Sequence, residues 1–173
     1  MKKKLMIWLL LVCLVLTGCG KPAEQEEKKA LDPVIVEGLT EAIDNHIQAE
    51  ITSGENLPLM VQYNNELLGC IRFRILDFNL SDKAVIVEFT YVDALKLADS
   101  FTDPNLTQDG FYSGSIEALW AGKFSTITEK ITVNFEATGS GYVIVNSEAL
   151  VNVLSGGVLY YYMELLEDAG YGE

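Results

Sequence analysis

The sequence contains little histidine, cysteine or proline, and these shortages limit the structures and the sites that the chain can form. Its 173 residues include one histidine, His46, three cysteines and four prolines. With so few prolines and a hydrophobic content of 49%, the chain is not disordered over most of its length. Cys70 is the one cysteine beyond the first nineteen residues, so the main domain has no internal disulfide and must fold by packing alone.

Basic residues are scarce as well. The net charge is −13, and Lys2, Lys3 and Lys4 precede the first apolar run without any acid beside them. Without these three cations, nine basic side chains face 25 acidic ones, which gives the remainder a charge of −16. Nucleic-acid binding is excluded, because contacts with phosphates require Lys and Arg side chains that displace counterions. Cationic peptides, metal cations and cell-wall amines stay open as partners, beside a simple role in solubility.

The start of the chain combines positive charge with a short apolar segment. Twelve apolar residues run from position 5 to position 16. A helix of that length spans about 18 Å, whereas the hydrocarbon core of a bilayer is about 30 Å thick. The segment is therefore too short for a stable membrane span, and it predicts a signal peptide over residues 1–18.

The residues that close this segment, Leu16-Thr17-Gly18-Cys19, resemble the lipobox of bacterial lipoproteins. In that family a diacylglycerol is joined to the cysteine thiol, and the peptide is cut immediately before that cysteine. The resemblance implies cleavage between Gly18 and Cys19, a lipid anchor on Cys19, and a cell-membrane location facing outside the cytoplasm. Stable anchoring then requires two or more acyl chains, because one chain gives only marginal residence. The alternatives are an ordinary secretory signal with a chance cysteine and an uncleaved anchor.

A tether and a helix follow the leader. Residues 19–30 are polar, charged and without periodicity, which predicts a flexible, solvated linker. Asp32-Pro33 indicates an N-cap followed by proline at the first helical position. Apolar residues then recur at three- and four-residue spacing, so we expect an amphipathic helix of about twenty residues that ends near Ser53-Gly54.

The next part of the chain carries strand patterns. Residues 57–68 are ambiguous, because the alternation of apolar side chains there and the pair Asn64-Asn65 are compatible with a short hairpin. Residues 70–75 alternate cleanly, and residues 84–92 are rich in β-branched and aromatic types, which predicts two antiparallel strands. A second pair of strands is expected over residues 127–137 and 142–145.

Helices are expected between and after the two pairs of strands. Asp93 is a candidate N-cap for a short helix over residues 94–101. Ser113 or Ser115 is expected to start a second helix that stops at Gly122. A final helix, capped by Asn146 or Ser147, is interrupted at Gly156-Gly157 and resumes over residues 158–167, ending at Gly170.

This order of elements predicts one α+β domain over residues 31–173, with an antiparallel sheet packed against the N-terminal helix and a helical insertion between the strand pairs. The order, together with the string from Gly141 to Leu150, resembles the cystatin-like and NTF2-like domains of small bacterial lipoproteins. Those domains often place Trp-x-Ile in the last strand, before a capped helix and a Gly-Gly pair. Here Tyr142 takes the place of the tryptophan. The resemblance covers roughly residues 31–157.

Few residues in the sequence are candidates for catalysis or metal binding. His46 borders an apolar helical stripe, which favours a partly buried, hydrogen-bonded ring over a catalytic base or metal ligand. Cys70 lies near Arg72, which can lower a thiol pKa, although a small buried hydrophobic residue is the more frequent role of cysteine. The run from Asp103 to Asp109 imitates a calcium loop, but Gln108 replaces its glycine and no glutamate closes it. No metal, cofactor or catalytic residue is predicted.

The aromatic residues offer a candidate ligand pocket, lined by Trp120, Phe124 and Tyr161, of the kind that cone-shaped NTF2-like domains possess. The competing interpretation is core packing, because aromatic side chains bury large areas in any domain. The leading functional hypothesis is a non-enzymatic, membrane-anchored domain that binds a protein, peptide or envelope component. The alternative is a small NTF2-like enzyme or small-ligand-binding cavity protein, with His46 or an aspartate as base.

Overall fold

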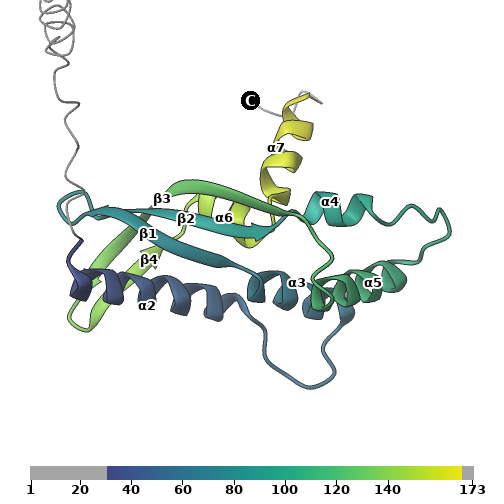
Figure 1. Ribbon diagram of the computed structural model, residues 1–173, viewed down its shortest axis with the longest axis horizontal. Coiled ribbons are helices and arrows are strands. Elements are labelled where there is room, and N and C mark those ends of the chain that lie inside the picture. The colour runs from purple at the N-terminus through teal and green to yellow at the C-terminus, as the bar shows by residue number, and fades with distance from the viewer. Residues whose placement is uncertain (1–30, 169–173) are drawn as a thin grey trace, which may run out of the picture. The chain divides into compact units, whose positions relative to one another are not determined.

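A four-stranded antiparallel sheet in the order β1-β2-β3-β4 lies at the centre of the computed structural model, which describes residues 31–168 (Figure 1). The predicted signal peptide, its cleavage site at Gly18 and Cys19, and the tether over residues 19–30 lie outside the described residues. The strands, in chain order, are β1 (Arg72–Asn79), β2 (Ala84–Val92), β3 (Thr126–Thr138) and β4 (Gly141–Val145).

The sheet is built from two hairpin-like pairs joined through β2 and β3. In register, Phe73 lies opposite Phe89 and Val87 lies opposite Ile131. The long strand β3 then turns at residues 139–140 and pairs with β4. The register of β1 shifts between Ile75 and Asp77, which marks a bulge at this edge of the sheet. The predicted strand pairs are confirmed.

Helix α2 (Pro33–Glu50) lies along the face of the sheet that carries the buried side chains of β2 and β3 (Figure 1). Asp32 caps it by accepting the backbone N–H of Val34, as the sequence predicts. Its apolar stripe is buried in a core shared with β2, β3, β4 and α6, because apolar residues three and four positions apart share one side of a helix. This main core contains the fully buried side chains Leu39, Ile43, Val85, Val87, Phe89, Val133, Phe135, Leu150 and Val153.

The ambiguous segment before β1 is a helix, α3 (Leu59–Gly69), and the hairpin alternative is wrong. The carboxamide of Asn65 accepts the N–H of Thr52 at 3.0 Å and donates to the carbonyl of Thr52 at 2.8 Å. Asn65 therefore holds the loop before α3 instead of turning a hairpin. Tyr63 and Leu67, one helical turn apart, are buried together in a second apolar cluster.

Helices α4 (Ala94–Asp99) and α5 (Gln108–Trp120) form the predicted insertion between β2 and β3. Asp93 caps α4 as predicted, but α5 begins earlier than the predicted Ser113 or Ser115. The hydroxyl of Thr107 accepts the N–H of Gly110 at 3.1 Å and so supplies the N-cap. The predicted start was wrong because Gly110 and Gly114 interrupt the helical pattern of the sequence.

Two short helices complete the domain. Helix α6 (Glu148–Leu154) is capped by Ser147 and packs against the main core through Leu150 and Val153. Helix α7 (Val158–Asp168) follows after the residue pair Gly156-Gly157. The fold is the predicted α+β class, with an antiparallel sheet packed against helices, and it is consistent with small cystatin-like and NTF2-like domains.

Candidate functional site

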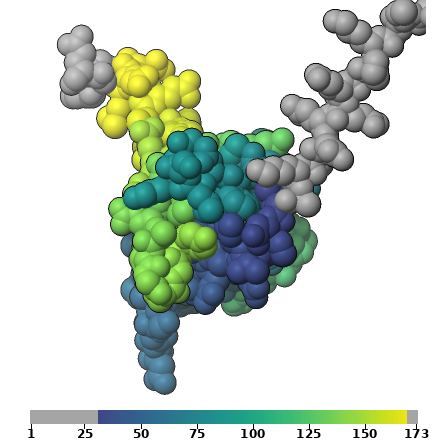
Figure 2. All heavy atoms as spheres, turned by 90° about the vertical axis from the view of Figure 1, so that its left-hand side faces the viewer, coloured from purple at the N-terminus to yellow at the C-terminus, as the bar shows by residue number. Residues whose placement is uncertain are grey.

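Helix α7 stands away from the sheet and from the other helices (Figures 1 and 2). It is the one helix between residues 31 and 168 in which no residue is buried. Within this described part, no single helix is long and apolar enough to cross a membrane. Helices α6 and α7 meet the criteria of length and composition only as a pair, which is bent by 117°.

The junction between α6 and α7, residues 155–157, fixes the direction of α7. The side chain of Asn152 on α6 accepts the backbone N–H of Tyr160 at 3.0 Å. The hydroxyl of Ser155 accepts the N–H of Leu159 at 3.3 Å. The first N–H groups of a helix have no partner within the helix, so these two side chains cap α7 from the body of the domain.

The two glycines of the junction make the bend possible. Gly156 has φ +68° and Gly157 has φ +85°, in the region that favours glycine. The carbonyl of Gly156 accepts the N–H of Ala94 at 3.0 Å, which ties the junction to the start of α4. A Cβ on Gly156 would lie 2.8 Å from the Cβ of Ala94 and 3.1 Å from the carbonyl oxygen of Val92. The position and direction of α7 are therefore determined by specific contacts.

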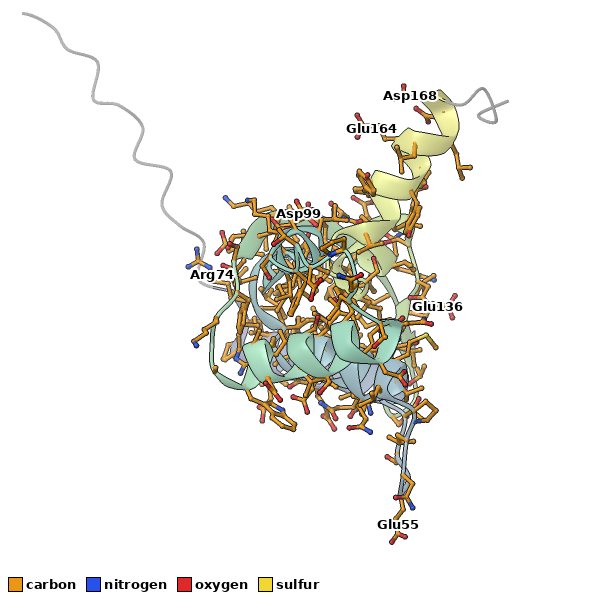
Figure 3. All side chains as sticks on the ribbon, turned by 90° about the vertical axis from the view of Figure 1, so that its right-hand side faces the viewer. Glu55, Arg74, Asp99, Glu136, Glu164 and Asp168 are labelled. Carbon is orange, nitrogen blue, oxygen red and sulfur yellow. The ribbon has the colours of Figure 1, made fainter. Side chains whose placement is uncertain are left out.

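The surface of α7 has an apolar side and an acidic side. Val158, Tyr162, Leu165 and Leu166 follow the i, i+4, i+7, i+8 spacing of one helix face. Three of these side chains are well exposed: Tyr162 by 58%, Leu165 by 44% and Leu166 by 53%. The polar side carries only acids, Glu164, Glu167 and Asp168, two of which are labelled in Figure 3.

Further negative charge surrounds the base of α7. Burial raises the pKa of the Tyr160 hydroxyl, and the nearby carboxylates of Glu148 and Glu129 raise it further. Glu129 also accepts a hydrogen bond from the hydroxyl of Tyr91 at 2.8 Å. The pKa of Tyr91 is raised by burial first and then by this carboxylate. The helix thus leaves the domain from an acidic surface.

The three aromatic residues of the predicted pocket do not come together at one of the hollows described below. Trp120 ends α5 with its side chain 69% exposed. Phe124 is half-buried against the second apolar cluster. Tyr161 lies on α7, 44% exposed, with its ring 6.0 Å from that of Tyr162. None of the three lines these hollows, and their placement could not be read from the sequence because it depends on where α5 ends and where α7 points.

The hollows on the surface of the described domain include the following three. Two lie beside the start of β1, with volumes of about 320 and 170 Å³, and share Arg72, Phe73 and Arg74. Arg74 is paired with Glu88 at 2.6 Å, a contact that lowers the pKa of this carboxyl. The third, which we call the α2–α6 hollow, has a volume of about 290 Å³ and is lined by Glu50, Asn64, Leu68, Asn146, Val151, Leu154 and Ser155.

His46 and Cys70 occupy structural positions. The Nε2 atom of His46 lies 2.9 Å from the carboxamide oxygen of Asn146, and the ring is half-buried, as predicted. Cys70 packs against the second apolar cluster. Burial raises the pKa of its thiol and outweighs the opposite effect of Arg72, so an activated thiolate is not supported.

The segment that imitates a calcium loop has another role. The carboxylate of Asp103 accepts the N–H of Asn105 at 2.9 Å, and Thr107 caps α5. These side chains therefore stabilise the turn at residues 103–105 and the start of α5. No group of three or more His, Cys, Asp or Glu side chains in residues 31–168 lies close enough to hold a metal ion.

Sequence reasoning missed the residues that hold α7, Asn152 and Ser155. The available indication was a polar residue in the apolar run of α6, followed by a Gly-Gly pair and a tyrosine-rich segment. A buried polar side chain generally has a hydrogen-bond partner, so Asn152 in that position implies a nearby free N–H group. The chain matches no protein-family model, no curated protein and no solved structure.

Proposed function

We propose that the chain is a lipid-anchored, non-enzymatic binding protein that faces outside the cytoplasm and presents α7 to a partner protein. The anchor rests on the resemblance of residues 16–19 to a lipobox. The observation that carries the binding role is α7 itself, an amphipathic helix with no buried residue whose direction is fixed by Asn152 and Ser155. Contiguous exposed apolar surface of this kind marks interaction sites in soluble domains.

The chemistry of α7 favours one class of partner. Tyr162, Leu165 and Leu166 fit an apolar groove in the helix-in-groove mode of recognition. The acids Glu164, Glu167 and Asp168 predict Lys or Arg side chains along the rim of that groove. Opposite charges speed the encounter of two proteins and fix their relative position. We therefore propose a partner protein with an apolar groove and a basic rim.

Two other occupants fit α7 less well. A second copy would bring two acidic helices together, and like charges beside a helical interface are destabilising. A membrane surface is negatively charged, and interfacial helices carry Lys and Arg on their polar face, whereas α7 carries neither. Both occupants give distinct results in the experiment below.

Site-specific photo-crosslinking of the full chain, in the cells that produce it, tests the proposal. A photoreactive benzoylphenylalanine replaces Tyr162 or Leu165 on the apolar face, and Trp120 in a control chain, because Trp120 is 69% exposed on a different helix. We expect one discrete protein adduct from positions 162 and 165 and none from position 120. Mass spectrometry of the adduct identifies the partner and its contact residues.

The role of the acidic side is tested in the Tyr162 crosslinking chain. Glu164→Gln combined with Glu167→Gln should lower the adduct yield by at least about threefold, because each lost charge weakens encounter with a basic rim. Glu136→Gln removes one exposed charge on β3 (Figure 3); it serves as the control for charge loss away from α7 and should leave the yield unchanged. Absence of an α7 adduct, an equal yield from position 120, an adduct of two copies of the chain, or adducts with lipid alone would each overturn the proposal.

A further inference from the structure

The α2–α6 hollow has one charged side chain in its lining, the carboxylate of Glu50, beside two carboxamides and an apolar floor. With about 290 Å³ it lies near the lower end of ligand pockets, which range from about 300 to 1,000 Å³, and it suits a small molecule or a single side chain. Leu68, Val151 and Leu154 give it an apolar floor. Such a floor accommodates a short aliphatic chain.

Negative charge is concentrated at one side of this hollow. Glu50 is the one ionisable residue among the lining residues, and it is the last residue of α2. The ion pairs between residues 31 and 168 are Arg74–Glu88 and Lys96–Asp93, so Glu50 has no cationic partner there. The C-terminal end of an α-helix also carries partial negative charge, and the last turn of α2 contains no basic residue to offset it.

Two carboxamides, those of Asn64 on α3 and Asn146 before α6, complete the polar lining. Their oxygen atoms are acceptors. The oxygen of Asn146 already accepts a hydrogen bond from Nε2 of His46 at 2.9 Å, so only one of its two lone pairs remains. The hydroxyl of Ser155 is already used, since it donates to the carbonyl of Asn152 and accepts the N–H of Leu159. The carboxylate of Glu50 and the C-terminus of α2 favour a positively charged donor, to which the carboxamide oxygens can add a hydrogen bond.

We infer that the α2–α6 hollow binds an organic cation, a primary ammonium or guanidinium group on a short apolar chain. The cation lies against Glu50 and the end of α2, and its chain lies over Leu68, Val151 and Leu154. The source is either a free amine or the side chain of a Lys or Arg residue in a polypeptide. This site is separate from the apolar face of α7 and does not depend on it.

Titration of the full chain, purified in detergent, with n-pentylamine tests the inference. Methyl NMR signals of Leu68, Val151 and Leu154 report occupancy of the hollow and give the dissociation constant. Pentan-1-ol, which has the same length without the charge, is the neutral control and should bind at least fivefold more weakly. Nα-acetyl-lysine methylamide distinguishes the sources: tighter binding than pentylamine indicates a polypeptide side chain, and weaker binding indicates a free amine.

Substitution of Glu50 tests whether its carboxylate binds the cation. Glu50→Gln should weaken pentylamine binding about fivefold, in keeping with an exposed ion pair worth up to about 1 kcal/mol. Glu55→Gln, at the tip of the loop between α2 and α3 (Figure 3), changes net charge equally and should leave binding within twofold. Both positions are exposed, so both variants should fold. Equal losses in the two variants, no loss in Glu50→Gln, or equal affinity for pentan-1-ol would overturn the inference.

Discussion

The carboxamide oxygen of Asn152 lies 3.0 Å from the backbone nitrogen of Tyr160, and this contact crosses the break between α6 and α7. Asn152 is only 3% exposed, whereas Tyr160, in the first turn of α7, is 41% exposed. A buried side chain thus caps a projecting helix. Together with Val158, which packs against the second apolar cluster, the contact fixes the direction of α7 although no residue of this helix is fully buried.

Removal of this cap should loosen α7. We expect Asn152→Ala to lower the free energy of unfolding by about 1–2 kcal/mol, because it removes a capping hydrogen bond and leaves buried groups unpaired. Hydrogen exchange of the Tyr160 amide should accelerate more than that of amides in β2. Asn45→Ala, an exposed position in the middle of α2, is the control and should stay within about 0.5 kcal/mol. Unchanged exchange at Tyr160 would contradict the capping role.

The junction should tolerate no side chain at position 156. Gly156→Ala combines a positive φ with a Cβ placed 2.8 Å from that of Ala94, so we expect a loss of about 2 kcal/mol or more, measured by urea denaturation. Gly139→Ala is the matched control, because a Cβ there meets nothing within 4 Å. Similar midpoints for the two variants would show that the junction is not tightly packed.

Stability should fall at alkaline pH through Tyr63. Burial, with a smaller contribution from Tyr112, raises the pKa of Tyr63 to about 12, whereas an unfolded tyrosine ionises near 10. The folded state therefore holds a proton that the unfolded state releases, and its stabilising effect, complete below pH 10, is lost progressively as the pH rises through 12. Tyr63→Phe should flatten this alkaline decline in urea midpoints measured from pH 8 to 11. Tyr161→Phe, at an exposed position, should follow the wild-type curve. Parallel declines in all three chains would refute the assignment.

The proposed lipid anchor on Cys19 is tested by substitution of that cysteine. Cys19→Ala should release the protein from the membrane fraction into the medium or periplasm, because no acyl chains can then be attached. Cys13→Ala, within the apolar run of the leader, is the matched control and should leave the protein at the membrane. Fractionation followed by immunodetection measures the distribution. Membrane retention of Cys19→Ala would refute lipidation at this residue.

Local patterns in the sequence predicted much of the fold. Asp32, Asp93 and Ser147 each precede an apolar helical pattern, and each caps a helix in the structure. Residues 84–92 were predicted as a strand with the observed bounds, because their β-branched and aromatic side chains match a buried strand. Capping and strand propensity depend on residues that are near one another in the chain, so one sequence suffices to recognise them.

Other features depend on contacts that the sequence does not display. Residues 57–68 fitted two structures, and the choice of a helix depends on the contact between Asn65 and Thr52 and on burial of Tyr63 against α5. The projection of α7 was not predictable, because a tyrosine-rich amphipathic helix is equally compatible with packing onto the sheet. The α2–α6 hollow combines residues from α2, α3 and α6, which no short motif connects.

Because of the way the junction is built, α7 should unfold locally more easily than the sheet and α2. The sheet and α2 are held by a continuous apolar core, whereas α7 is held by two capping side chains, a pair of glycines and the packing of Val158. Segments with few apolar contacts open at a small fraction of the global free energy. A protease that cleaves at Gly156-Gly157 would therefore detach the proposed recognition helix irreversibly and leave the sheet and the helices packed against it folded.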